Sequence, residues 1–257
     1  GTVDEAKPVL SLDQLFAQAE AVSPLFLRKV RGWAYESNGH FPLDRHTSAT
    51  TASLSAASAL ATVAFDAGES IATSVVGADR FQGADQGVRS TVMPNDGEGG
   101  GHRRGERYVK WKDLVDTEGE EEAVSLVGWA GIKGVSRAIE KVLRSYHGDA
   151  SLLCDLCRQS VIFTSVQDLT ACLECMSQDP DIVIVRVKNR LDRDYDVQVT
   201  AGYRDCGVNV RVVTREAEAM GVDTHVCELQ LILDKFANMK HDEGHRRYVT
   251  FRNFRGE

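Results

Sequence analysis

Four short polar signatures recur towards the end of the chain, each on or beside an apolar stretch. They are Lys-Asn-Arg at residues 188–190, Gly-Tyr-Arg-Asp at 202–205, Glu-Leu-Gln at 228–230 and His-Arg-Arg-Tyr at 245–248. The apolar stretches predict strands or helices, and such elements could hold these charged groups rigidly around one cleft. Such an arrangement is typical of an active site that handles phosphate.

Two carboxylates, Asp155 and Glu228, are the main candidates for catalysis. Asp155 comes just before a stretch that predicts a strand, and Glu228 lies inside another such stretch. A carboxylate in a strand costs free energy to bury unless it is paired or binds a metal. If the two acids converge, they could hold Mg²⁺ against phosphate oxygens, as phosphoryl-type transfer needs. A structural salt bridge is the alternative for either residue alone.

Basic side chains that could neutralise phosphate are spread over the same half of the chain. They are Lys133, Arg158, Lys188, Arg190, Arg204 and Arg246. Each would stabilise phosphate charge if the cleft forms, whereas singly each is more often a solvated surface residue. Tyr203 could lie flat under a purine base, and core packing is an equal alternative.

The cysteines allow a second interpretation, a zinc site. Cys154 and Cys157, followed by Cys172 and Cys175, approach the spacing of a four-cysteine zinc site. Their surroundings look helical and lack the Gly and Pro of tight turns, which favours buried thiols. Reduced thiols indicate a cytoplasmic location rather than a disulfide framework.

Length, net charge and hydropathy limit the classes of protein to which the chain can belong. The chain has 257 residues, which is long enough to bury a hydrophobic core. Its net charge of −8 argues against binding of nucleic acid over the whole surface. It contains no run of eighteen apolar residues, so no membrane span is expected. It begins at Gly1 without a methionine and stops straight after a patterned segment. We therefore expect a processed chain, or a piece of a longer protein with further domains.

The periodicity of apolar residues predicts an α/β (α+β) fold, a mixed four- or five-stranded sheet flanked by helices. Ser11 is a plausible N-cap for a first helix, and Pro24 is expected to open a second. Further helices are predicted at 134–146, 149–156, 166–177 and 215–220, and strands at 160–163, 182–187, 206–213 and 226–232. The residues expected to face inward from the helix at 134–146 are Val135, Ala138, Ile139, Val142 and Leu143.

Three parts are predicted along the chain. Residues 1–45 form N-terminal helices that pack on a catalytic domain at 119–257. Residues 46–118 are rich first in Ser, Thr and Ala and then in Gly, which predicts a long low-complexity insertion. A packed Ala-rich helix within 49–65, and a lid over the active site, are alternatives for this insertion.

Five pieces, in order, resemble the RelA/SpoT-homology synthetase domain, which has a nucleotidyltransferase-like fold. They are Lys133 with Ser136, the strand led by Asp155 with Arg158, the Gly-Tyr element at Tyr203, Glu228 with Gln230, and His245 with Tyr248. The resemblance covers about residues 130–254 and is closest to a divergent branch of the family.

The resemblance implies a pyrophosphokinase that transfers pyrophosphate from ATP to the 3′-hydroxyl of a nucleotide, preferably guanosine, or of RNA. This is the reaction of guanosine tetraphosphate (alarmone) metabolism. Asp155 and Glu228 would hold Mg²⁺, and Glu228 could also accept the hydroxyl proton. The residues that would bind nucleotide and phosphate are Lys133, Ser136, Arg158, Lys188, Arg190, Tyr203, Arg204, Gln230 and His245. The alternative is a catalytically silent nucleotide-binding regulatory domain of a larger protein, which Gly131 favours because the family usually has a basic residue there.

Overall fold

The computed structural model describes residues 9, 11–44, 108–200 and 202–239. The chain divides into two compact units, residues 1–45 together with 106–257, and residues 46–105. All described residues belong to the first unit. The possible helix at 49–65, His245 and Arg246 lie outside the described residues.

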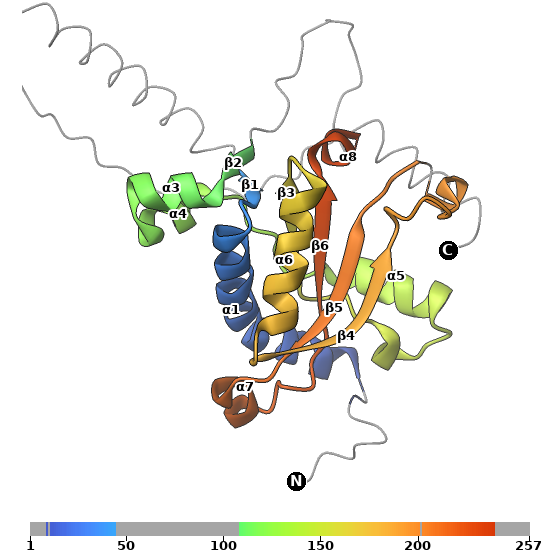
Figure 1. Cartoon of the computed structure of the whole chain (residues 1–257). Coiled ribbons are helices and arrows are strands. Elements are labelled where there is room, and N and C mark those ends of the chain that lie inside the picture. Colours follow the sequence, from blue (N-terminus) through green and yellow to red (C-terminus); the bar gives the residue numbers. More distant parts are fainter. Residues whose placement is uncertain (1–8, 10, 45–107, 201, 240–257) are drawn as a thin grey trace, which may run out of the picture. The chain divides into compact units, whose positions relative to one another are not determined.

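A six-stranded mixed sheet lies at the centre of this unit (Figure 1). Its strands are β1 (His40–Pro42), β2 (Tyr108–Lys110), β3 (Arg158–Phe163), β4 (Ile182–Asn189), β5 (Cys206–Val212) and β6 (Cys227–Leu233). Their order is β2-β1-β3-β6-β5-β4, with β3 and β6 parallel and the other neighbours antiparallel. The predicted fold class is confirmed. The additional strands β1 and β2 are too short to show a periodicity in the sequence.

The described helices are α1 (Leu12–Glu36), α3 (Trp111–Glu118), α4 (Glu120–Leu126), α5 (Val135–Ser145), α6 (Val166–Gln178), α7 (Arg215–Met220) and α8 (Asp234–Met239). Ser11 caps α1 as predicted, since its hydroxyl accepts a hydrogen bond from the backbone N of Gln14. The prediction that Pro24 opens a second helix is wrong, because α1 runs through it without a break. Val22, Leu25 and Phe26 are buried around the proline, and this packing offsets the lost backbone hydrogen bond. Within the described ranges, none of the helices combines the length and the apolar character needed to cross a membrane.

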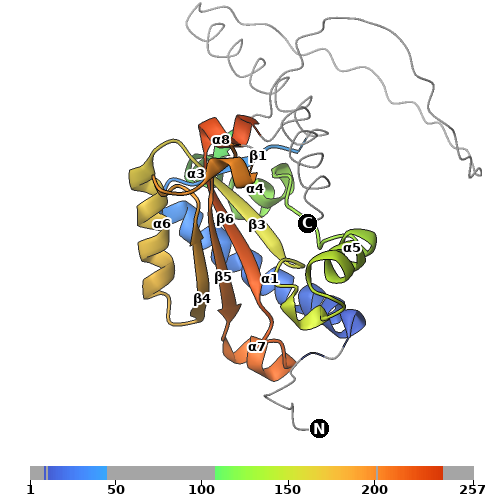
Figure 2. The ribbon, with the colours of Figure 1, turned by 90° about the vertical axis from the view of Figure 1, so that its right-hand side faces the viewer.

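The two faces of the sheet differ in character. Side chains alternate along a strand, so Val208, Leu229 and Leu231 point to one face, where they are buried in the core with α1 and α6. Glu228 and Asn209, which pair across β6 and β5, point to the other face. Figure 2 shows α1 behind the strands, and Figure 1 shows α1 and α5 on opposite sides of them. The polar face is therefore the one on which a site can form.

Helix α5 has the predicted position but not the predicted packing. Ala138 and Val142 are buried, whereas Val135, Ile139 and Leu143 are exposed, Leu143 by 64%. Periodicity identifies an apolar stripe but not the width of the surface that it meets. The helix predicted at 149–156 is also shorter than expected, a 3₁₀ turn at Ala150–Leu152.

Residues 108–118 are regular, although they fall within the predicted insertion. They form β2 and α3, and Trp111 at the start of α3 is buried. The ring of Trp111 lies edge-on to Phe41 and to Trp129, with centroids 5.7 Å apart in both pairs. This aromatic group attaches α3 to the sheet.

Candidate functional site

Two rows of side chains cross the polar face of the sheet, from β3 to β4. The first row is Arg158, Glu228, Asn209 and Arg186, and the second is Ser160, Gln230, Gly207 and Lys188. Within the first row, Arg186 donates to Oδ1 of Asn209 from Nε at 3.1 Å and from Nη2 at 2.8 Å. Asn209 in turn donates from Nδ2 to the backbone oxygen of Cys154 at 3.2 Å. The row is therefore attached to the loop that carries Asp155.

Asp155 lies just before β3 and is only 8% exposed. Its Oδ2 accepts hydrogen bonds from Nζ of Lys133 at 2.6 Å and of Lys141 at 2.8 Å. Its Oδ1 is also buried and has no hydrogen-bond partner among the described residues. Burial by itself would raise the pKa of Asp155, but the two lysines outweigh it and hold the pKa below its usual value. Asp155 is therefore an ionised carboxylate, one oxygen of which makes no hydrogen bond to the described residues.

The side chain of Gln159 positions the segment that leads to Lys133. Gln159 is buried, donates from Nε2 to the backbone oxygen of Ala130 at 2.9 Å, and accepts from the backbone N of Ala130 at 3.2 Å. The backbone N of Lys133 donates to the oxygen of Leu156 at 3.0 Å. Together these bonds hold the segment beside the Asp155 loop, as a short strand pairing would.

Glu228, at the start of β6, is the second carboxylate of the site. Burial raises its pKa above the usual value, and the negative charge of Asp155 raises it further, while Arg158 opposes the change. Asp155 and Glu228, whose negative charges repel each other, are two carboxylates that could contribute to holding a divalent cation. Mg²⁺ is commonly held by one or two carboxylates together with substrate phosphates. In the part of the chain that is described, no group of three or more His, Cys, Asp or Glu side chains could hold a metal by itself.

Asp205 connects two of the predicted site residues and is completely buried. Its Oδ1 forms an ion pair with Nη1 of Arg190, and its Oδ2 accepts a hydrogen bond from the hydroxyl of Tyr203 at 3.2 Å. Burial opposes the charge of Arg190, but Asp205 outweighs it and raises the arginine pKa. Burial, followed by Asp205, raises the pKa of Tyr203, so the phenol stays protonated. Asp205 therefore fixes the positions of both side chains.

The remaining predicted site residues that the structure describes have different surroundings. Lys188 and Gln230 flank Gly207 in the second row, and Gln230 accepts a hydrogen bond from the hydroxyl of Ser160 at 3.3 Å. Arg204 donates to the backbone oxygens of Arg190 and Asp192, so it stabilises a loop. Ser136 is exposed in the first turn of α5.

The six cysteines are all unpaired. Cys154 and Cys157 lie in the loop before β3, whereas Cys172 and Cys175 lie on α6. Cys157 and Cys172 are buried. Burial raises the pKa of Cys172 to about 12, which keeps this thiol protonated.

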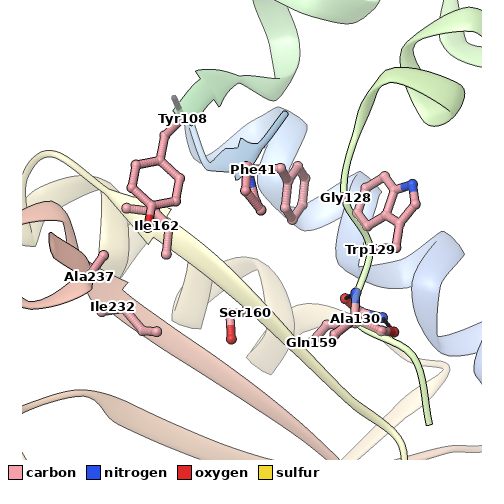
Figure 3. A pocket seen from close by; sticks show the side chains of 11 residues that line it. Phe41, Tyr108, Gly128, Trp129, Ala130, Gln159, Ser160, Ile162, Ile232 and Ala237 are labelled. Carbon is pink, nitrogen blue, oxygen red and sulfur yellow. Dashed lines mark hydrogen bonds between the residues drawn. The ribbon is translucent and has the colours of Figure 1, made fainter. Parts of the chain in front are cut away.

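A cavity of about 190 Å³ opens on the same face of the sheet, towards the other ends of β3 and β6. Figure 3 shows the rings of Tyr108, Phe41 and Trp129 above the strands, with Ser160 and Ile232 below them. An engineered cavity of about 150 Å³ holds one benzene molecule. The cavity therefore suits one planar ring system rather than a whole nucleotide.

Lys141→Met is expected to reduce stability mainly at neutral pH. The lowered pKa of Asp155 contributes stability that is present above the ordinary carboxyl pKa and is lost as the pH falls through the folded-state value. Without Lys141, only Lys133 opposes the effect of burial. The difference in free energy of unfolding between the native protein and the variant should shrink towards acid pH in urea titrations. A difference that is independent of pH would contradict this assignment.

The comparisons with known proteins concern the fold. No model of a protein family matches the chain, and no curated protein matches it. Among solved structures, the chain is similar to small alarmone synthetase 1 from Bacillus subtilis bound to its product pppGpp, with a TM-score of 0.37, 15% identity, and coverage of 46% of this chain and 60% of that one. It is also similar to small alarmone synthetase 2 from Bacillus subtilis, with a TM-score of 0.36, 17% identity, and coverage of 48% of this chain and 61% of that one. A GTP pyrophosphokinase family protein from Streptococcus pneumoniae gives a TM-score of 0.36, 17% identity, and coverage of 49% of this chain and 68% of that one.

The chain thus spans about 60% of the length of the first of these neighbours.

Proposed function

We propose that this domain is a Mg²⁺-dependent pyrophosphokinase, which uses ATP to transfer pyrophosphate to a ribose 3′-hydroxyl. The observation that carries the proposal is the Asp155–Glu228 pair, in which one buried oxygen of Asp155 has no partner among the described residues. Around it lie Lys133 and Lys141, both paired with Asp155, and Arg158, opposite Glu228. A purely structural ion pair would not need a second carboxylate nearby.

Asp155 and Glu228 would hold the metal ion. When bound, the ion supplies positive charge that offsets the negative charge of the phosphate oxygens. Glu228 is also the proposed proton acceptor for the ribose hydroxyl. Its raised pKa makes it a stronger base than an exposed carboxylate. The proton would pass from the hydroxyl oxygen to the carboxylate while that oxygen attacks the β-phosphorus of ATP. The bond between the β-phosphorus and the oxygen that bridges to the α-phosphorus would break, and AMP would leave with that oxygen.

Cationic side chains surround the position proposed for the triphosphate. Lys133, Arg158, Lys188 and Arg190 lie on the polar face or at its edge. Guanidinium and ammonium groups held in place before the reaction stabilise charge without having to reorganise. These four groups would bind the phosphate oxygens of the donor and the acceptor.

The aromatic cavity and Tyr203 offer two places for a base. The cavity begins at Ser160 of β3, in the row next to Glu228. Tyr203 is anchored through its hydroxyl to Asp205, so its ring could stack on the other base. We assign the acceptor base to Tyr203, with guanosine preferred and an RNA 3′ end as the other acceptor to test.

Incubation with Mg²⁺ and β-labelled ATP tests the proposal. GTP, GDP, GMP, the adenine nucleotides and tRNA are offered as acceptors, each beside a Glu228→Gln control. Label is expected to move to one acceptor in the native protein only, with release of AMP. The proposal fails if no acceptor is labelled while ATP and Mg²⁺ are shown to be bound.

The regulatory alternative is favoured by one observation. Lys133 and Lys141 both form ion pairs with Asp155, so their positive charges offset the charge of this carboxylate. A silent domain would be stabilised thermally by nucleotides and would release no AMP.

A further inference from the structure

Strand β4, at one edge of the described sheet (Figure 1), contains an irregularity that changes which of its side chains face the site. Ile184 pairs with Val210 of β5, whose side chain is buried in the core. Val185 has no partner in the register with β5, and the pairing resumes with Arg186 opposite Asn209. Since side chains alternate along a strand, Arg186 would share the core face with Ile184 if no residue were inserted between them. The β-bulge at Val185 therefore turns Arg186 to the polar face, and bulges beside active sites commonly redirect a side chain in this way.

The side chain of Arg186 holds the amide of Asn209 in one orientation. It donates to Oδ1 of Asn209 from two nitrogens, Nε at 3.1 Å and Nη2 at 2.8 Å. A guanidinium group has donors and no acceptor, so the oxygen of the amide lies on its side. The amide nitrogen then points the other way and donates to the backbone oxygen of Cys154 at 3.2 Å. Asn209 is buried, whereas Arg186 is exposed.

The bond to Cys154 holds one end of the loop that presents Asp155. After Asp155, the backbone oxygens of Leu156 and Cys157 accept hydrogen bonds from backbone N–H groups. Before it, the backbone oxygen of Cys154 is held by the Asn209 amide. An amide that turned over would bring its own oxygen against the Cys154 oxygen, and two acceptors form no hydrogen bond. The orientation of this amide therefore decides whether the loop is held on both sides of the carboxylate.

We propose that Arg186 is a positioning residue for Asp155, and that it acts through the amide of Asn209. This inference rests on the proposed function and adds to it the groups that hold the first carboxylate in place. A displacement of about 1 Å in an active site can cost about 100-fold in rate. The competing role for Arg186, as an exposed cation on the polar face, is to bind phosphate directly.

Four variants separate these roles, Arg186→Met, Arg186→Lys, Asn209→Leu and, as matched control, Arg211→Met. Lysine keeps a group that only donates, so it still orients the amide, whereas methionine does not. Leucine has nearly the shape of asparagine but can neither donate nor accept. Arg211 also lies on β5 and donates from Nε to a backbone oxygen, that of Asp223 at 2.8 Å, which belongs to a different loop.

The rate of pyrophosphate transfer at saturating ATP and Mg²⁺ is expected to fall about 100-fold in Asn209→Leu. Arg186→Met should show a smaller loss, while Arg186→Lys and Arg211→Met should stay close to native. The KM for ATP should change little in all four. Because Arg186 is exposed, Arg186→Met should keep the native melting temperature, and it tests the inference even if Asn209→Leu folds poorly. A native rate in Arg186→Met would overturn the inference.

The double variant Arg186→Met with Asn209→Leu decides between positioning and direct binding. If the arginine acts through the amide, its loss should add nothing to the loss caused by Asn209→Leu. Losses that multiply, or a KM for ATP that rises sharply in Arg186→Met while kcat is kept, would show that Arg186 binds substrate itself.

Thiol labelling measures the loop without any substrate. Cys154 and Cys175 are both partly exposed, and Cys175 lies on α6, away from the loop. The labelling rate of Cys154 relative to Cys175, mapped by mass spectrometry, should rise several-fold in Asn209→Leu and stay native in Arg211→Met. If the native protein transfers pyrophosphate and this ratio is unchanged in Asn209→Leu, the inference is wrong and the proposed function stands. If the native protein transfers none, the proposed function is wrong, whereas faster labelling of Cys154 would still support the inferred hold on the loop.

Discussion

Glu228→Gln is expected to lower the rate of pyrophosphate transfer by about 100- to 10,000-fold, the usual contribution of a positioned general base. Glutamine keeps the shape of the side chain but can neither accept the proton nor offer a charged metal ligand. The affinity for ATP should change much less, because Lys133 and Arg158 remain. Single-turnover transfer of labelled phosphate and ATP titration measure the two effects separately.

The same variant is expected to be at least as stable as the native protein at neutral pH. Burial and Asp155 raise the pKa of Glu228, so folding disfavours its ionised form. An acid with a raised folded-state pKa makes the protein less stable as the pH rises from the ordinary carboxyl pKa through the folded-state value. Glutamine removes this cost, and thermal melts over a range of pH should show it.

Glu216→Gln is a suitable control, because Glu216 forms an exposed ion pair with Arg28. Such pairs contribute little, so both activity and stability should stay close to native. If Glu228→Gln were clearly less stable than native at neutral pH, Glu228 would be a structural ion-pair partner. The assignment as proton acceptor would then be wrong. A rise in stability together with a loss of activity is the pattern expected of an active-site residue.

The local pattern of apolar residues was sufficient to predict the helices and strands in which that pattern is strongly periodic. The strands that became β3, β5 and β6 and the helices that became α6 and α7 lie within a residue or two of their predicted bounds. Pro24 and the outward residues of α5 were mispredicted for a common reason. What a segment packs against is decided by distant parts of the chain, which can override propensity and leave an apolar stripe uncovered.

The two carboxylates of the candidate site stand out in the sequence, whereas the side chains that pair with them do not. Asp155 and Glu228 are recognisable because an acid at the edge or inside of an apolar stretch needs compensation. Lys141, Gln159 and Asp205 were not among the predicted site residues, since their contacts with Asp155, Ala130 and Arg190 arise only in the folded chain. The available signal for Asp205 was an acid directly before a buried strand, within a basic cluster.

Asp205→Asn should be the most destabilising of the substitutions considered. Removing one partner of a buried ion pair costs about 3–5 kcal/mol, because the other charge stays buried without compensation. Asparagine has nearly the same shape, so a loss of this size reports charge rather than packing. The guanidinium of Arg190 and the hydroxyl of Tyr203 would both lose their fixed partner, and nucleotide affinity should fall as well. Urea unfolding and nucleotide titration measure the two effects.

Asp181→Asn provides the matched control. Asp181 pairs with Lys29, but its side chain is 46% exposed, so its loss should cost less than about 1 kcal/mol. The double variant Asp205→Asn with Arg190→Gln should lose less stability than the sum of the two single variants, because each single change leaves one member of the pair unpaired. Equal costs for Asp205→Asn and Asp181→Asn would show that the Asp205–Arg190 pair does not organise the site. The large cost with a coupled double variant, in contrast, would mean that one buried acid holds both Arg190 and Tyr203, the proposed platform for the acceptor base.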